Sequence, residues 1–184
     1  MPTALVTGAT AGIGESFTRL LASKGYDLVI TARKKKRLEE CAKNLINKYK
    51  IKVEIIAADL NKPNEVAHIV KRLTDSKKPI EVLINNAGFG IKTSFLHSEF
   101  ADENSLLDVL VKVPMQLTHA VLPYMKARNS GRIINVSSVA GWITGGTYSA
   151  AKSYVTVFSE YLHTELSGTN VKVTALCPGF THTE

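Results

Sequence analysis

The sequence predicts an α/β fold in which a parallel β-sheet carries helices on both of its faces. Short β-branched apolar runs alternate with longer segments of helical periodicity along the whole chain. Runs such as Leu28-Val29-Ile30 and Val82-Leu83-Ile84 are apolar throughout, which is typical of strands buried on both faces. A glycine-rich segment, Thr7–Gly14, joins the first such run to the first helical segment. These observations indicate a doubly wound sheet.

The expected elements follow one another without a linker or a low-complexity segment. Strands are expected at Thr3–Thr7, Asp27–Thr31, Val53–Ala58, Ile80–Asn85, Arg132–Val136 and Val171–Leu176. Helices are expected at Ile13–Lys24, Lys34–Lys48, Asn64–Ser76, Glu103–Ala127 and Thr147–Leu166. This alternation implies right-handed crossovers and a Rossmann fold. We expect residues 1–184 to form a single nucleotide-binding domain.

Glycine and proline mark several of these boundaries. Gly25 follows the first helix and Gly168 the last, and a glycine in the left-handed conformation commonly ends a helix. Pro63 lies at the start of the third helix, where its missing N–H costs nothing. The positions of these residues therefore agree with the helix boundaries that the apolar periodicity predicts.

Composition excludes several classes of protein. The chain is 45% apolar and 21% charged, which excludes disordered and fibrous proteins. It begins without a basic segment followed by an apolar one, and no later run approaches ~18 uninterrupted apolar residues, so we expect a soluble cytoplasmic protein without a membrane partner. Cys41 and Cys177 are expected to be free thiols, and the five scattered histidines predict no metal site.

The net charge of +7 does not indicate a nucleic-acid partner. The lysines are spread along the chain and no aromatic residues alternate with them, unlike in nucleic-acid-binding modules. A basic surface that attracts small anionic molecules is the preferred interpretation.

The segment between the first strand and the first helix is suited to a pyrophosphate. Its glycines, Gly8, Gly12 and Gly14, are spaced GxxxGxG and allow a tight turn and a close approach of the backbone to a ligand. The following helix presents its positive end to the same place. The segment therefore predicts a dinucleotide site, although an ordinary glycine-rich turn would have a similar composition.

The residues after the second strand favour NADP(H) over NAD(H). Enzymes that use NAD commonly have an acidic residue there for the adenosine ribose, and this chain has Arg33 and Lys34 instead. A guanidinium binds a 2′-phosphate through paired charge-assisted hydrogen bonds. Asp59 follows the third strand, where it either lies near the adenine or caps the next helix.

Tyr148 and Lys152 are the candidate catalytic pair. Their spacing places a phenol and an ammonium one turn apart on the same side of a helix. A cation beside a phenol favours the phenolate, so the pair could exchange a proton with a substrate. Ser138 could orient the substrate oxygen, and Ser137 is an alternative at similar spacing.

Six motifs occur in a fixed order: TGxxxGIG at Thr7–Gly14, Asp59-Leu60, Asn85-Asn86-Ala87-Gly88, Asn135-Val136-Ser137-Ser138, Tyr148-x3-Lys152 and Pro178-Gly179. With them the chain resembles the classical short-chain dehydrogenase/reductase family over its whole length. The resemblance implies that Gly8, Thr10, Gly12, Ile13 and Gly14 form the cofactor loop. It implies that Asp59 contacts adenine, and that the turn Asn86, Ala87 and Gly88 lies along the adenosine ribose and stabilises the sheet.

The resemblance also implies catalytic roles. Ser138 would hold the substrate oxygen, Tyr148 would be the general acid or base, and Lys152 would bind the nicotinamide ribose and promote ionisation of the phenol. The segment Pro178, Gly179 to Thr183 would meet the nicotinamide carboxamide. Trp142, in the segment between Ser138 and Tyr148, would either line the substrate mouth or cover the core.

The chain departs from the family pattern at two places. Leu110 occupies the position of the catalytic asparagine, whose main-chain carbonyl in the family is thought to hold a relay water exposed by a helix kink. Pro114 lies four residues later and lacks the N–H that would bond that carbonyl, so we expect it to produce the kink. Family members continue past Pro178-Gly179 into a substrate lid and a last strand, so the domain is expected to be incomplete at its C-terminus.

The leading prediction is an NADP(H)-dependent oxidoreductase that acts on a small-molecule carbonyl or alcohol. The alternative is a catalytically silent dinucleotide-binding regulator of the same fold, which Leu110 and the short C-terminus suggest. Family members commonly pair through their fourth and fifth helices, and a homodimer or homotetramer is expected on that ground.

Overall fold

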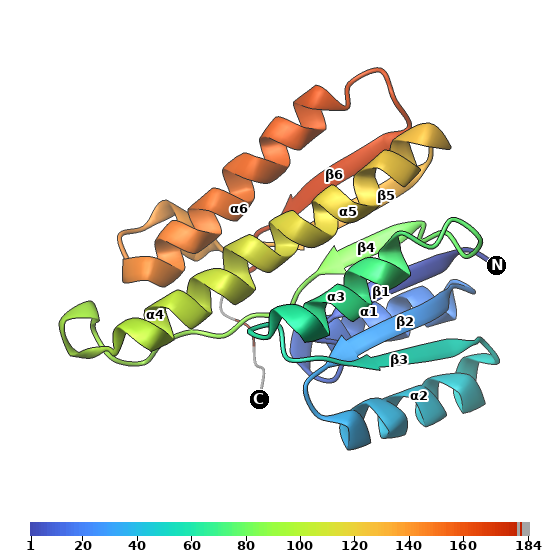
Figure 1. Cartoon of the computed structure of the whole chain (residues 1–184), viewed down its shortest axis with the longest axis horizontal. Helices are drawn as coiled ribbons and strands as arrows, with labels where there is room; N and C mark the ends of the chain where they lie inside the picture. Colours follow the sequence, from blue (N-terminus) through green and yellow to red (C-terminus); the bar gives the residue numbers. More distant parts are fainter. Residues whose placement is uncertain (180, 182–184) are drawn as a thin grey trace.

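The strands form one parallel sheet at the centre of the molecule. The computed structural model describes residues 1–179 and residue 181. Within them the sheet has six strands in the order β3-β2-β1-β4-β5-β6 (Figure 1). The strands are β1 Thr3–Thr7, β2 Asp27–Ala32, β3 Val53–Ala57, β4 Val82–Asn85, β5 Gly131–Val136 and β6 Val171–Leu176. The order reverses between β1 and β4, as in a Rossmann fold.

The helices lie near their predicted positions, with ends that shift by a few residues. They are α1 Gly12–Ser23, α2 Lys35–Tyr49, α3 Pro63–Leu73, α4 Phe100–Leu107, α5 Val113–Ala127 and α6 Gly146–Glu165. Short helical turns occur at η1 Phe95–His97, η2 Asp108–Lys112 and η3 Val139–Trp142. Pro63 opens α3 as predicted, and Gly25 and Gly168 have positive φ just after α1 and α6.

Two apolar layers pack against the two faces of the sheet. Alternate residues of a strand point to opposite faces, so Leu5 packs with α3, α5 and α6, whereas Ala4 and Val6 pack with α1 and α2. Figure 1 shows α5 and α6 running side by side over β5 and β6. Burial of these side chains is the main stabilising contribution to the fold.

The helices cover β5 and β6 less completely on the side of α1 than on the other side. On the side of α1 their residues Arg132, Lys172 and Thr174 are exposed, whereas Ile133, Val171 and Val173 are buried on the opposite side. No helix of the described residues lies over this part of the sheet, and among them β6 pairs only with β5. Polar side chains at alternate positions make this exposed face compatible with water.

The predicted fourth helix is interrupted by a π-helical turn. The turn covers Asp108–Lys112, and the N–H of Val113 donates to the carbonyl of Asp108. Pro114 follows immediately and has no N–H to offer the carbonyl of Leu110. The predicted departure from α-helical geometry is therefore present, and it takes the form of a π turn rather than an open kink.

The same helical stretch has the length and composition of a membrane span. Phe100–Ala127 contains an 18-residue window with a mean hydropathy of 1.2, and it is the one helix among the described residues with this length and composition. Its apolar side chains Leu117, Val121 and Met125 are fully buried in the core. We therefore interpret the stretch as a core helix.

Candidate active site

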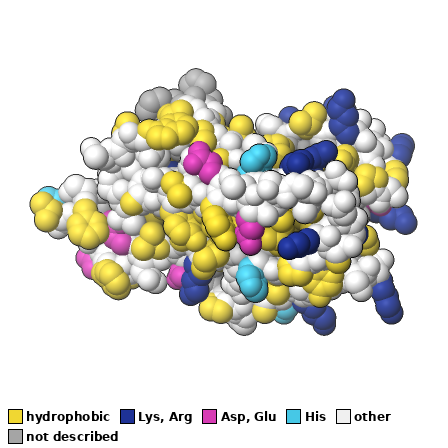
Figure 2. All heavy atoms as spheres, turned by 90° about the horizontal axis from the view of Figure 1, so that it is seen from above, with side chains coloured by type: hydrophobic (Ala, Val, Ile, Leu, Met, Phe, Trp, Pro, Cys, Tyr) yellow, Lys and Arg dark blue, Asp and Glu magenta, His cyan; other side chains and the backbone are white. Residues whose placement is uncertain are grey.

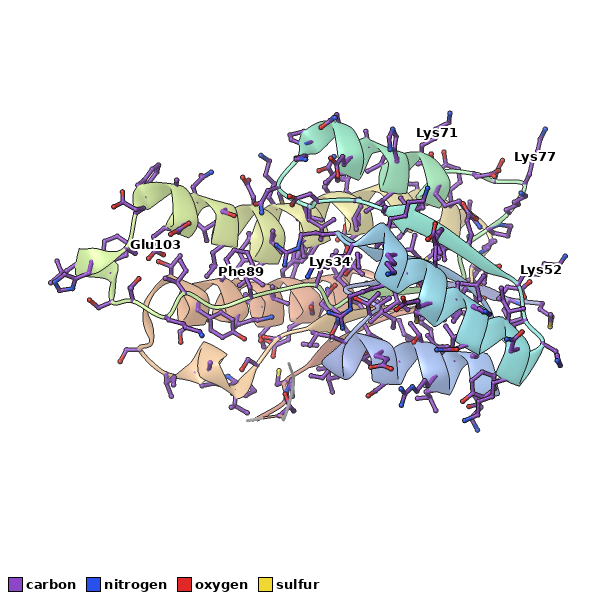
Figure 3. All side chains as sticks on the ribbon, turned by 90° about the horizontal axis from the view of Figure 1, so that it is seen from below. Lys34, Lys52, Lys71, Lys77, Phe89 and Glu103 are labelled. Atoms are coloured by element: carbon purple, nitrogen blue, oxygen red, sulfur yellow. The ribbon has the colours of Figure 1, made fainter. Side chains whose placement is uncertain are left out.

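A cleft of about 900 Å³ runs along the carboxyl ends of the strands, where doubly wound sheets bind their ligands. It extends from the loops after β1 and β2 to the first turns of α6, and the two ends differ in chemistry. Lys34 belongs to the basic end, and Phe89 lies toward α6 (Figure 3). Most of the predicted site residues line this cleft: Gly8, Thr10, Gly12, Ile13, Arg33, Asp59, Asn86, Ala87, Gly88, Ser138, Tyr148, Lys152, Pro178 and Gly179.

The glycine loop is a close-fitting cradle. Gly8 has φ +66°, and a Cβ there would lie 2.9 Å from the Cα of Ala87. A Cβ at Gly14 would lie 2.1 Å from the carbonyl oxygen of Gly8, so the start of α1 approaches the loop more closely than any other residue would allow. Ala11, which precedes α1, has no side chain that caps the helix. The first-turn N–H groups are thus available to an anion, and the cradle fits a pyrophosphate.

Thr7 fastens the loop after β4 to the end of β1. Its Oγ1 accepts hydrogen bonds from the N–H groups of Asn86 (2.9 Å) and Ala87 (3.0 Å). Asn86 Nδ2 in turn donates to the carbonyls of Thr7 (2.9 Å) and Gly8 (3.2 Å). The sequence analysis did not single out Thr7 as a site residue. Its place as the last residue of the strand before the glycine loop is the signal that could have found it.

Three basic side chains surround the far end of the cradle. Arg33 and Lys34 are exposed and line the cleft. Arg37 lies in the first turn of α2, and its guanidinium donates to the carbonyl of Thr10 at 3.1 Å. Arg37 was missed by the sequence analysis, although a basic residue in the first turn after Arg33 and Lys34 is close in sequence to the same loop.

Asp59 does not cap α3. Its carboxylate accepts a hydrogen bond from the N–H of Asn61 at 3.0 Å, which makes a local Asx turn. The residue that precedes α3 is Lys62, and no side chain caps that helix. The helix-cap alternative is wrong, and Asp59 lies in the wall of the cleft.

Tyr148 and Lys152 lie together at the other end of the cleft. Lys152 Nζ is 5.6 Å from the centre of the Tyr148 ring and donates to the carbonyl of Val136 at 2.7 Å. The lysine is only 5% exposed. Burial lowers the pKa of its ammonium to about 8, although Cys177 acts in the opposite direction.

The geometry separates Ser138 from Ser137. Ser137 Oγ is buried and hydrogen-bonded to the carbonyl of Lys152 at 2.7 Å and to Thr156 Oγ1 at 2.8 Å. Ser138 Oγ accepts from the N–H of Ala140 at 3.1 Å, and its longer contact with the carbonyl of Pro178 is 3.5 Å. Ser138 is the serine whose hydroxyl is less engaged by the protein.

Three further residues were singled out in the sequence: Leu110, Trp142 and Thr183. Leu110 is buried beneath Gly88, where an added Cβ would lie 2.7 Å from Leu110 Cδ2. Trp142 is 66% exposed, so it does not cover the core. Thr183 lies outside the described residues.

Comparison with known proteins identifies relatives over nearly the whole chain. The short chain dehydrogenase family matches residues 2–184. Sulfoacetaldehyde reductase 2 of Chromohalobacter salexigens is 33% identical over 98% of this chain and 73% of its own length. An NADP-dependent 3-hydroxy acid dehydrogenase of Shigella flexneri is 36% identical over 95% of this chain and 71% of its own length.

Solved structures agree closely with the fold. A short-chain dehydrogenase from Sphingobium yanoikuyae in complex with NADPH has a TM-score of 0.96 and 34% identity, over 100% of this chain and 72% of that one. A bulky-bulky ketone specific alcohol dehydrogenase from Comamonas testosteroni has a TM-score of 0.95 and 33% identity, over 98% of this chain and 73% of that one.

The burial of Lys152 predicts a specific dependence of stability on pH. The pKa of the ammonium falls from 10.5 for a free lysine to about 8 in the folded chain, so between these pH values the unfolded chain binds more protons. The free energy of unfolding of the wild type should therefore rise across that window, by up to about 3 kcal/mol, relative to Lys152→Met. Urea denaturation at several pH values measures this.

Lys126→Met, which removes an exposed lysine of α5, is the matched control and should follow the wild type. Parallel stability curves for the wild type and Lys152→Met would contradict the assignment.

Proposed function

The chain belongs to the short-chain dehydrogenase/reductase family, and on this premise we propose that it is an NADP(H)-dependent enzyme that interconverts an alcohol and a ketone or aldehyde. One observation carries the proposal: Ser138, Tyr148 and Lys152 line one end of a cleft whose other end is a glycine cradle with basic side chains. When bound, the cofactor would donate hydride to the carbonyl carbon or accept it from the alcohol.

The three side chains have complementary tasks in this proposal. Tyr148 gives a proton to the carbonyl oxygen during reduction and takes it back during oxidation. Lys152 supplies positive charge beside the phenol and stabilises its anion. Ser138 donates a hydrogen bond to the same substrate oxygen and holds it in reach of Tyr148. Such a constellation is of no use to a protein that only binds a dinucleotide.

Preference for NADP(H) is supported by the basic residues at the far end of the cleft. Arg33 and Lys34 line the cleft after β2 and would bind the 2′-phosphate in this proposal, and the hydrogen bond from Arg37 to the carbonyl of Thr10 connects α2 with the glycine loop. Solved relatives in complex with NADPH and NADP+ agree with this interpretation. The proposed cofactor site is completed by Gly8, Thr10, Gly12, Ile13, Gly14, Asp59, Asn86, Ala87, Gly88, Tyr148, Lys152, Pro178 and Gly179, and by Thr183, which lies outside the described residues.

The proposed substrate is a small molecule that carries a carbonyl or an alcohol group. The cleft is also lined by Phe89, Ile91 and Val109, whose apolar side chains favour contact with hydrocarbon parts of such a molecule.

An oligomer is the proposed form of the protein. Tyr154, Val157 and Tyr161 form an exposed apolar stripe on α6, and Met115 lies beside it on α5. Figure 2 looks onto the molecule from above the view of Figure 1, in which α6 is uppermost, and shows hydrophobic side chains gathered near the middle, with most Lys and Arg side chains toward one end. We propose a homodimer or homotetramer that buries this stripe, in the cytoplasm, without a nucleic-acid or membrane partner.

The π turn bears on how Tyr148 could be resupplied with protons. Leu110 cannot contribute a side-chain amide, but its carbonyl faces a residue, Pro114, that cannot bond it in the α-helical manner. We propose that this carbonyl accepts from a relay water that connects to Lys152.

Tyr148→Phe tests the catalytic assignment. Removing the hydroxyl should lower kcat for ketone reduction by about 10²-fold or more and leave NADPH affinity nearly unchanged, because the ring and its packing remain. Tyr154→Phe, on the exposed side of the same helix, is the control and should retain activity. Wild-type turnover in Tyr148→Phe would exclude the proposed role.

Arg33→Ala tests the choice of cofactor. Loss of a charge-assisted hydrogen bond should weaken NADPH binding by about tenfold or more and change NADH binding little. Fluorescence titration of both cofactors measures this, with Lys36→Ala as the control from the same basic segment. Equal affinities of the wild type for NADPH and NADH would remove the argument.

Pro114→Ala tests the proposed role of the π turn. The restored N–H allows an α-helical bond to Leu110, so kcat should fall by about tenfold while the unfolding free energy stays the same or rises. Pro123→Ala lies in the same helix and serves as the control. An unchanged kcat in Pro114→Ala, with the new amide at residue 114 protected from hydrogen exchange, would argue against the relay.

A further inference from the structure

Glu103 is a buried carboxylate that the proposed reaction does not use. It belongs to α4 and is 8% exposed, and it is the only acidic side chain among the buried residues of the described chain. Ser98 Oγ donates to its Oε1 at 2.6 Å, whereas Oε2 is buried with no hydrogen-bond partner. Burial of a carboxylate is costly unless positive charge or hydrogen-bond donors compensate it. The source of that compensation is therefore informative.

The start of α6 lacks the features that normally stabilise a helix N-terminus. Gly145, which precedes the helix, has no side chain that could cap it, and the first turn holds no acidic residue. Gly146 has φ +69°, a conformation that only glycine adopts without strain. The first-turn N–H groups thus present an uncompensated partial positive charge. Tyr148 lies in this same turn.

Glu103 and the start of α6 meet. Leu106 of α4 packs with Ala151 and Tyr148 of α6, and Glu103 and Thr147 each lie about one turn nearer the start of these two helices. In agreement with this arrangement, the hydroxyls of Ser98 and then Thr147 hold the pKa of the Glu103 carboxyl below its usual range. Below this contact Leu106, Leu110 and Ala151 pack together with Tyr148 against them. Figure 3 shows the Glu103 side chain beside α4, on the side of this helix that faces the rest of the molecule. α4 and α6 are therefore joined by an apolar cluster and by one charged side chain.

We propose that Glu103 is a positioning residue for Tyr148: its carboxylate, supplied from α4, compensates the uncapped start of α6 and holds Thr147 and the turn that carries the catalytic phenol. The two buried charged side chains of the described residues, Glu103 and Lys152, would then act on opposite sides of Tyr148 along α6. Glu103 would fix the first turn, and Lys152 would supply charge to the phenol. The part of this inference that concerns turnover rests on the proposed function.

Amide hydrogen exchange of Glu103→Ala tests the proposal without depending on turnover. Exchange at residues 149–152, whose N–H groups donate to the carbonyls of residues 145–148 in a regular α-helix, should become at least about tenfold faster than in the wild type, because the first turn of α6 loses its compensating charge. The later turns of α6 should change less. Asp102→Ala, which removes an exposed acid from the same helix, is the matched control and should exchange like the wild type.

Kinetics on the same variants test the consequence for catalysis. Glu103→Ala should lower kcat by about tenfold or more, while the Kd for NADPH stays within about twofold, because misplacement of the phenol affects the reacting atoms and not the cradle. Glu103→Gln keeps the shape and one accepting oxygen but loses the charge, so its effects should be smaller and in the same direction. A purely structural role would lower stability without separating kcat from cofactor affinity.

Two outcomes would overturn the proposal. One is exchange at residues 149–152 that is the same in Glu103→Ala and Asp102→Ala; if Glu103→Ala does not fold, the same comparison between Glu103→Gln and Asp102→Asn decides. The other outcome is a wild type that reduces carbonyls and a folded Glu103→Ala variant with the same kcat. A wild type without carbonyl reduction would refute the proposed function, and the exchange comparison would still decide the role of Glu103.

Discussion

The cleft depends on the hydrogen bonds that fasten the loop after β4 to the end of β1. These two strands are neighbours in the sheet, but the chain leaves them toward opposite faces, which opens a crevice at their carboxyl ends. Thr7 and Asn86 bridge the crevice with four hydrogen bonds and hold the glycine loop against Ala87. The close approach explains why Gly8 and Gly14 tolerate no side chain. The four hydrogen bonds therefore hold the shape of the glycine loop before any ligand binds.

A second network places the catalytic helix relative to that cradle. Asn85 Nδ2 donates to Asn135 Oδ1 at 2.8 Å, and Asn135 Nδ2 donates to Ser159 Oγ at 2.9 Å. The chain of buried amides therefore ties β4 to β5 and β5 to α6, in an interior where unpaired polar groups are costly. Lys152 adds a bond to the carbonyl of Val136. Lys152 and Ser159 thus tie α6, and with it Tyr148, to β5.

Electrostatics divides the cleft into regions with different tasks. Arg33 and Lys34, the exposed cations between the end of β2 and the start of α2, suit a phosphate. Lys152, the single buried cation among the described residues, lies beside Tyr148. Apolar residues beside Tyr148 keep this region poor in competing charge, which strengthens the interactions of Lys152 with whatever develops negative charge there. The π turn below it, at Asp108–Lys112, disturbs the helix where Leu110 meets Gly88.

The sequence by itself determined the fold, because apolar runs and glycine punctuation act locally, and it also determined which loops line the cleft, since parallel strands bring their carboxyl ends to one edge. The same spacing placed Tyr148 beside Lys152, as two residues one turn apart on a helix must be. Only the tertiary structure decided between Ser138 and Ser137, excluded Asp59 as a cap, exposed one side of β5 and β6, and revealed Thr7, Arg37 and Glu103. Each of these depends on contacts between segments distant in the chain, and no local pattern encodes which hydroxyl or carboxylate is already engaged by a neighbour.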